Sequence, residues 1–152
     1  MSGTPSFKEI TTFVFDMDGV LTDGTLILLP NQMPVRTMHI KDGYALQLAI
    51  KKGYRIMVIS GSVSEPGVER LNKLGIESVL MNVQDKRKLL QDLIKKNSLQ
   101  SNEVLYMGDD MPDYAAMMVC GLPCSPADAV DEIKSISSYI SPYAGGKGCV
   151  RD

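Results

Sequence analysis

Five aspartates form two short clusters whose spacing suits metal-assisted chemistry. Asp16 and Asp18 follow the apolar run TFVF, and Asp109, Asp110 and Asp113 form the segment GDDMPD. Side chains two residues apart on an extended chain point the same way, and two carboxylates held that close repel each other unless a cation intervenes. Oxygen ligands with room for water suit Mg²⁺. A single pair would fit a loop or a helix cap equally well, but two clusters favour a magnesium site.

A serine and a lysine lie where two further apolar runs give way to polar residues. Ser60 ends the run YRIMVIS, and Lys86 follows shortly after SVLMNV. Taken alone, Ser60 with Gly61 indicates a turn after a strand, and Lys86 indicates a solvated helix residue. Whether these side chains belong with the carboxylates depends on how the chain folds.

Short apolar runs alternate with helical patterns along the chain, and this alternation predicts an α/β fold. Strands are expected over residues 12–17, 54–60, 78–83, 103–110 and 121–127, and helices over 43–53, 65–75, 85–96, 112–120 and 128–136. Asp42 is the expected N-cap of the first helix. Such an order forms a parallel sheet with helices on both faces, and ligands bind beyond the carboxyl ends of its strands. The candidate groups all lie near such ends.

Residues 24–41 predict a hairpin flap, with two strand-like arms around Pro30-Asn31-Gln32. Its arm TLILL would expose an apolar patch, which indicates an interface unless the arm folds onto its own sheet. The glycines in residues 143–152 predict either a mobile gate or a plain flexible tail.

Composition limits the classes of function. The 152 residues suit one domain, and a net charge of -2 gives no basic excess for binding nucleic acid or anionic lipid. We expect no signal peptide and no membrane span. Cys120, Cys124 and Cys149 lack the spacing of a zinc site, and an odd, small count predicts reduced thiols in the cytoplasm.

The segments DMDGVLTDG, ISGS, DK and GDDMPD, in this order, resemble the four motifs of the haloacid dehalogenase superfamily. The resemblance runs from Phe13 to Asp152 and implies a Rossmann-like, three-layer parallel sheet forming a single domain over residues 1–152. It implies that Asp16 attacks phosphorus and forms an aspartyl phosphate. Asp18 would protonate the leaving oxygen and then activate water.

The same resemblance assigns roles to the other motif residues. Mg²⁺ would be held by the Asp16 carboxylate, the Asp18 backbone carbonyl and Asp109. Asp110 and Asp113 would orient metal-bound waters or Lys86, although Asp113 also suits the start of a helix. The Ser60 hydroxyl, the Gly61 N–H and Lys86 would hold the phosphoryl group.

The short flap and the lack of a cap domain resemble the capless subgroup of 3-deoxy-D-manno-octulosonate (KDO) 8-phosphate phosphatases. The matching segments are VRTMHIKDGYALQLA, CGLPCSPADAVDEIKSISSYIS and GGKGCVRD. This resemblance implies a homotetramer whose active sites are completed by neighbouring subunits, and a phosphorylated sugar acid as the substrate. The implied substrate contacts, beyond Asp18, Gly61 and Lys86, are His39, Ile40, Lys41, Asp42, Gly43, Gln47, Ser62 and Arg70.

Gln47 and Ser62 depart from the subgroup, whose members often carry arginine at these positions. A 2-keto-3-deoxy-nonulosonate 9-phosphate phosphatase is therefore an alternative activity. A receiver-like phospho-signalling domain is an alternative of another class, but such domains do not need an acid two residues beyond the nucleophile, and they lack GDDMPD.

Overall fold

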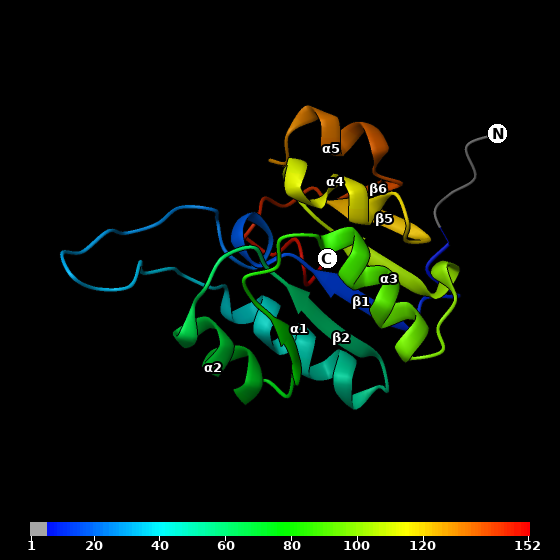
Figure 1. The fold of residues 1–152 in the computed structure, drawn as a ribbon, viewed down its shortest axis with the longest axis horizontal. Coiled ribbons are helices and arrows are strands. Elements are labelled where there is room, and N and C mark those ends of the chain that lie inside the picture. Colours follow the sequence, from blue (N-terminus) through cyan, green and yellow to red (C-terminus); the bar gives the residue numbers. More distant parts are fainter. Residues whose placement is uncertain (1–5) are drawn as a thin grey trace.

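The computed structural model of the chain describes residues 6–152 and has a six-stranded parallel sheet at its centre (Figure 1). The strands run in the order β3-β2-β1-β4-β5-β6. They are β1 (Thr12–Phe15), β2 (Arg55–Ile59), β3 (Ser78–Leu80), β4 (Val104–Met107), β5 (Leu122–Ser125) and β6 (Tyr139–Ile140). The helices are α1 (Ile40–Lys51), α2 (Glu65–Lys73), α3 (Lys86–Lys96), α4 (Met111–Met117) and α5 (Asp131–Ile136), with short helical turns η1 (Met17–Leu21) and η2 (Ser101–Glu103). The predicted α/β class and parallel sheet are confirmed.

Alternate residues of the buried strands supply two cores, one on each face of the sheet. Phe15 packs in a cluster with Leu46 of α1 and Leu71 of α2. Val14, its neighbour in β1, belongs to the opposite cluster with Leu90 of α3. Since successive side chains of a strand point to opposite faces, this division makes three layers: two helices, the sheet and three helices.

The strand order reverses between β1 and β4, and this place determines where the site forms. Both strands are central and parallel, and Phe15 of β1 lies beside Met107 of β4. The residues that follow, Asp16 and Asp109, therefore leave the sheet at the same edge. Ligands of open α/β sheets bind at such a reversal point.

One local prediction was wrong, and one strand was not predicted. Helix α1 begins at Ile40, so its N-cap is His39, which makes no side-chain capping bond. Asp42 lies buried inside the helix, where its Oδ1 accepts a hydrogen bond of 2.8 Å from the backbone N–H of Arg151. Strand β6 was not predicted, because its two residues give no alternation to detect.

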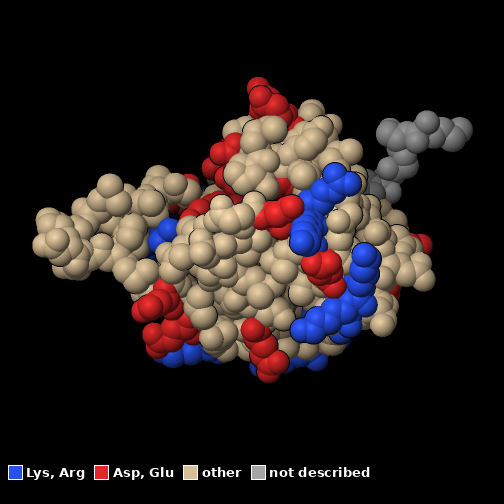
Figure 2. Space-filling model, in the orientation of Figure 1, with Lys and Arg blue, Asp and Glu red and all other residues tan. Residues whose placement is uncertain are grey.

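The flap extends away from the sheet as the blue-to-cyan loop in Figure 1. A single antiparallel bridge joins Ile27 and Val35, with backbone bonds of 3.1 and 3.0 Å. The expected strand-like arms are thus reduced to one pair. Residues 24–35 carry no charge, which Figure 2 shows as a tan projection, and Leu28 is 75% exposed. The apolar arm does not fold onto its own sheet in this structure.

The glycine-rich tail packs against the turn that follows β1. The Gly146 N–H donates to the carbonyl of Val20 at 2.9 Å, and the Cys149 thiol donates to the same carbonyl at 3.3 Å. A Cβ at position 145 would collide with the carbonyl of Gly19. Close backbone approach is therefore one use of Gly145 and Gly146. The gate and the flexible tail both stay predictions.

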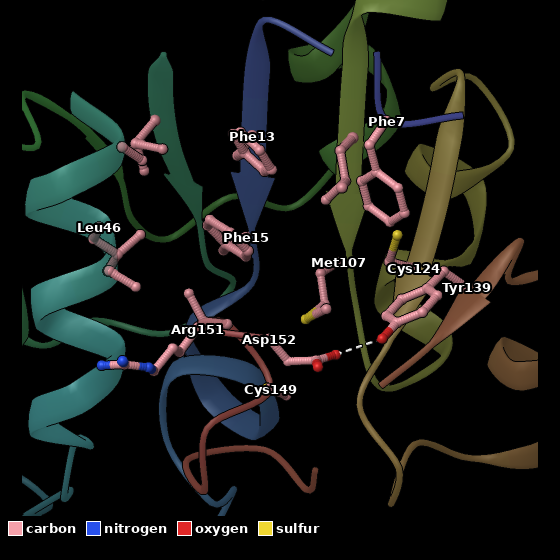
Figure 3. A pocket seen from close by; sticks show the side chains of 15 residues that line it. Phe7, Phe13, Phe15, Leu46, Met107, Cys124, Tyr139, Cys149, Arg151 and Asp152 are labelled. Atoms are coloured by element: carbon pink, nitrogen blue, oxygen red, sulfur yellow. Dashed lines mark hydrogen bonds between the residues drawn. The ribbon is translucent and has the colours of Figure 1, made fainter. Parts of the chain in front are cut away.

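An apolar pocket of about 250 Å³ lies between helix α1 and one face of β1, β4 and β5 (Figure 3). Phe13, Phe15 and Met107 point into it from the strands, and the tail lies along its edge. The Tyr139 hydroxyl donates to Asp152 at 2.6 Å and ties the tail to β6. Within residues 6–152, no helix has the length and apolar character needed to cross a bilayer.

Candidate active site

A polar pocket opens at the carboxyl ends of β1, β2 and β4. It contains the motif residues from every segment singled out in the sequence. The residues that line it are Asp16, Asp18, Gly24, Ser60, Gly61, Ser62, Val83, Gln84, Lys86, Asp109, Asp110, Pro112 and Asp113. Parallel strands end at one edge of a sheet, so residues far apart in sequence meet there.

Asp16 is buried at the base of this pocket, where β1 ends and η1 begins. Its Oδ1 accepts hydrogen bonds from the Met17 N–H at 2.8 Å and from Lys86 Nζ at 3.0 Å. Burial raises the pKa of Asp16 to about 8, and the Asp113 charge adds to this while Lys86 opposes it. A carboxylate in this position is held in one orientation but lacks sufficient positive charge around it.

Asp113 and Lys86 form a buried pair behind Asp16. Asp113 Oδ1 accepts from Lys86 Nζ at 2.7 Å and from the Tyr106 hydroxyl at 2.8 Å, while Oδ2 accepts from the Asp109 N–H at 3.2 Å. Burial opposes the charge of Lys86, but the Asp113 and Asp16 carboxylates outweigh it and raise the lysine pKa. Asp113 therefore fixes Lys86 as a cation directed at Asp16.

Asp109 faces Asp16 with an unsatisfied oxygen. Its Oδ1 is buried and has no hydrogen-bond partner among the described residues. Burial and the Asp113 charge raise the pKa of Asp109 to about 6. Gly19 packs against its carboxylate with φ of +90°, where any Cβ would collide with Asp109.

The arrangement fits a divalent cation. One carboxylate oxygen from each of Asp16, Asp109 and Asp113 lies within 4.8 Å of the others. Buried carboxylates are expensive unless they are paired, and the free oxygen of Asp109 is such an unpaired group. All of the donors are oxygens, which suits Mg²⁺.

Asp18 is more exposed than Asp16, and four donors surround its carboxylate. Arg36 of the flap binds both oxygens, at 2.7 and 3.1 Å. The Ser62 hydroxyl donates to Oδ2 at 2.9 Å, and the Thr22 hydroxyl donates to Oδ1 at 3.3 Å. Asp18 therefore lies beside the Ser60–Ser62 loop, which lines the pocket.

The Ser60–Ser62 loop presents hydroxyl groups to the pocket. The hydroxyl oxygens of Ser60 and Ser62 are 2.9 Å apart, and the Ser62 N–H donates to Ser60 Oγ at 3.2 Å. Asp110 is exposed and caps its own helix by accepting from the Met111 N–H at 2.7 Å. Its contact in this structure is the cap rather than Lys86.

Several predicted substrate residues lie outside the polar pocket. His39 and Lys41 line a separate hollow with Lys147 and Arg151 of the tail. Asp42, Gly43 and Arg70 line a narrow gap between α1 and α2, where the Arg70 guanidinium rests against Gly43. Ile40 is exposed and Gln47 is half-buried on α1. The single chain therefore brings the catalytic candidates together with Gly61 and Ser62, while the implied contacts from α1 and α2 lie outside the polar pocket.

Sequence reasoning missed Arg36, Tyr106 and Thr22. Tyr106 reads as one more apolar strand residue, and Thr22 as a turn residue. Arg36 did leave a signal, because it is the sole lysine or arginine between residues 24 and 40. A lone cation in an apolar flap needs a partner, and the nearby carboxylates are the obvious choice.

Known proteins resemble this chain in sequence. The profile of a family described as haloacid dehalogenase-like hydrolase matches residues 75–150. The 3-deoxy-D-manno-octulosonate 8-phosphate phosphatase of Haemophilus influenzae is 30% identical over 145 residues, which is 95% of this chain and 81% of that protein. The enzyme of the same name from Escherichia coli K12 is 29% identical over 145 residues, covering 95% of this chain and 77% of its own length.

Solved structures agree with the sequence matches. A 3-deoxy-D-manno-octulosonate 8-phosphate phosphatase from Moraxella catarrhalis, in complex with a magnesium ion, a phosphate ion and KDO, superposes with a TM-score of 0.92. It is 31% identical and covers 95% of this chain and 83% of its own. A cobalt-bound phosphatase from Haemophilus influenzae has a TM-score of 0.91 at 30% identity, covering 95% of this chain and 85% of its own.

Proposed function

The chain belongs to the haloacid dehalogenase-like hydrolases, and we propose that it is a magnesium-dependent phosphatase of KDO 8-phosphate, acting in lipopolysaccharide biosynthesis. The observation that carries this proposal is the meeting of Asp16, Lys86 and Asp109 at the ends of β1 and β4. A buried carboxylate with a fixed ammonium group on one side and an unsatisfied carboxylate on the other suits attack on a metal-bound phosphate. The structural likeness to an enzyme that holds magnesium, phosphate and KDO supports the substrate.

The reaction divides between two aspartates. An Asp16 oxygen forms a bond to phosphorus, and the bond from phosphorus to the ester oxygen breaks. The electron pair stays on that oxygen, which takes a proton from Asp18 and leaves as the alcohol. Water then attacks phosphorus and gives a proton to Asp18, so that phosphate departs and the Asp16 carboxylate is restored.

The surrounding residues would hold the charges during both steps. Lys86, fixed by Asp113, would neutralise a phosphoryl oxygen, and the Ser60 hydroxyl and the Gly61 N–H, which line the same pocket, would donate to another. Mg²⁺ would be held by Asp16, Asp109 and the backbone carbonyl of Asp18. When bound, it offsets the repulsion between the anionic nucleophile and the anionic substrate.

The flap supports a homotetramer. Leu26, Ile27, Leu28 and Leu29 are all at least 43% exposed and adjacent, and such a patch marks an interaction site. His39, Lys41 and Arg70 lie outside the polar pocket of their own chain. In an assembly, a neighbouring subunit would bring cations toward that pocket. The free thiols of Cys120, Cys124 and Cys149 support a cytoplasmic location.

The nine-carbon 2-keto-3-deoxy-nonulosonate 9-phosphate is the second candidate substrate. Ser62 supports it, because this position offers the pocket a hydroxyl bound to Asp18 and no cation for a carboxylate. Gln47 likewise adds no charge to α1. The two substrates share the same primary phosphate ester chemistry, so the mechanism is common to both.

Steady-state kinetics with Mg²⁺ tests the function. The wild type should hydrolyse p-nitrophenyl phosphate, and among phosphorylated sugar acids it should prefer KDO 8-phosphate over the nine-carbon acid and over simple sugar phosphates. Asp16→Asn should lower kcat by more than about 10³-fold, because covalent catalysis has no other nucleophile here, while its circular dichroism stays unchanged. An Asp16→Asn variant with full activity would remove Asp16 from the mechanism. No turnover by the wild type at high enzyme concentration would leave a receiver-like phosphoacceptor as the better account.

A further inference from the structure

Arg36 makes a two-point contact with Asp18 from the base of the flap. Its Nε donates to Asp18 Oδ1 at 2.7 Å, and its Nη2 donates to Oδ2 at 3.1 Å. The Arg36 side chain is 8% exposed and that of Asp18 is 29% exposed. Arginine and carboxylate matched in this way are fixed in one plane, which a lysine would not achieve.

Stability alone gives little reason to bury this guanidinium. Removing an ion pair from water costs several kcal/mol, so a buried pair is weak ground for a stabilising role. The remaining contact of Arg36 is a bond of 3.4 Å to the carbonyl of Pro34 in the flap itself. Arg36 and Lys86 are the two cations, among residues 6–152, that bind the acids of the polar pocket directly.

The other donors around Asp18 complete the restraint. Ser62 and Thr22 reach different oxygens of the carboxylate from the two loops that border it. Without Arg36, the side chain would keep only these two hydroxyl contacts and would be free to turn into solvent. The guanidinium is therefore the group that holds the carboxyl plane over the pocket.

We propose that Arg36 is a positioning residue that orients Asp18 for transfer of its proton to the leaving oxygen. This inference rests on the proposed phosphatase function. In the first step the phosphorus–ester bond breaks, its electron pair goes to the ester oxygen, and the Asp18 proton goes to that oxygen. A proton on Asp18 replaces one of the four hydrogen bonds it accepts, and the remaining donors still fix its orientation.

Because Arg36 belongs to the flap, the position of the flap affects the orientation of Asp18. Arg36 follows Val35, which pairs with Ile27 across the flap. A displacement of this arm would carry the guanidinium away from Asp18. Correct seating of the flap is thus a condition for an oriented acid.

Leaving-group dependence tests the inference. An alkyl alcohol leaves only with a proton, whereas p-nitrophenolate departs without one. We expect Arg36→Gln to lower kcat/KM for KDO 8-phosphate, or for the nine-carbon acid if that is preferred, by more than about tenfold, since a general acid is worth roughly 10²–10⁴-fold. The same variant should lower kcat/KM for p-nitrophenyl phosphate by less than about threefold on the same grounds. Arg36→Lys should restore part of the alkyl phosphate activity.

A double-mutant cycle and a flap control complete the test. In an Asp18→Asn background, Arg36→Gln should cause no further loss, because the group it positions is absent. Gln32→Ala, at the exposed flap tip, should behave as wild type with both substrates. Equal losses on both substrates, or additive losses with Asp18→Asn, would overturn the inference while the phosphatase function stands. A wild-type chain that hydrolyses neither substrate would instead overturn the proposed function, and this inference with it.

Discussion

At the scale of single residues, the pocket depends on side chains that support others. Asp113 accepts from Lys86, Tyr106 and the Asp109 N–H, so one buried carboxylate connects three parts of the site. Such networks stabilise a site when every member is satisfied. The supporting contacts should therefore be visible in both stability and kinetics.

Tyr106→Phe tests this network. Phenylalanine fills the same buried space but leaves Asp113 without one donor, and a hydrogen bond to a charged group is worth about 1.5–3 kcal/mol. We expect the unfolding free energy to fall by about 1–2 kcal/mol and kcat to fall by less than about tenfold, because Lys86 keeps its direct bonds. Denaturant unfolding and steady-state kinetics measure the two effects.

Tyr114→Phe is the matched control, because Tyr114 lies half-buried on α4 and its hydroxyl makes no hydrogen bond within residues 6–152. It should leave both quantities unchanged. A Tyr106→Phe protein with wild-type stability and kcat would show that the hydroxyl contributes nothing to the position of Lys86.

The sequence predicted some of the residue contacts but not others. Asp16, Ser60, Lys86 and Asp109 meet in the structure because each follows a parallel strand, which the alternation of patterns already implied. Arg151 and Asp42 are 109 residues apart in the sequence, so no local pattern indicates their contact. That contact explains why a plausible N-cap aspartate is buried inside α1.

At the scale of elements, the flap and the tail are the parts that sequence described least well. The flap has one antiparallel bridge, and its apolar arm faces outward (Figures 1 and 2). The tail glycines Gly145 and Gly146 lie against the turn that follows β1, at Gly19 and Val20. The tail outcome depends on contacts between segments distant in sequence, which propensities do not encode.

Leu28→Asp tests the flap as an interface. Leu28 is 75% exposed, so a charge there costs the isolated fold little, but it would be buried in a flap-mediated assembly. We expect light scattering after size exclusion to show a tetramer for the wild type and a smaller species for the variant, with unchanged circular dichroism. Gln32→Glu adds a charge nearby without removing apolar surface and should remain tetrameric. A wild-type monomer, or a Leu28→Asp tetramer, would contradict the flap interface.

At the scale of the whole molecule, the fold gathers acidic groups at one end of a sheet and leaves their charge poorly compensated. Burial raises the pKa of both Asp16 and Asp109 above the ordinary value of 3.8. The folded metal-free protein therefore binds more protons than the unfolded chain at intermediate pH. By linkage, its stability falls as the pH rises from 3.8 through the folded pKa values of about 6 and about 8.

Magnesium should reverse this loss, because it binds the ionised carboxylates and competes with their protons. We expect the melting temperature of chelator-treated protein to fall between about pH 5 and about pH 8, and Mg²⁺ to raise it more at the higher pH. At 100 times the dissociation constant, the cation adds about 2.7 kcal/mol. Thermal melts with and without Mg²⁺ measure the effect. In Asp109→Asn, which removes a ligand and a buried charge, the fall with pH and the Mg²⁺ increment should both shrink. An increment equal at both pH values in the wild type would mean that the cation binds away from these carboxylates.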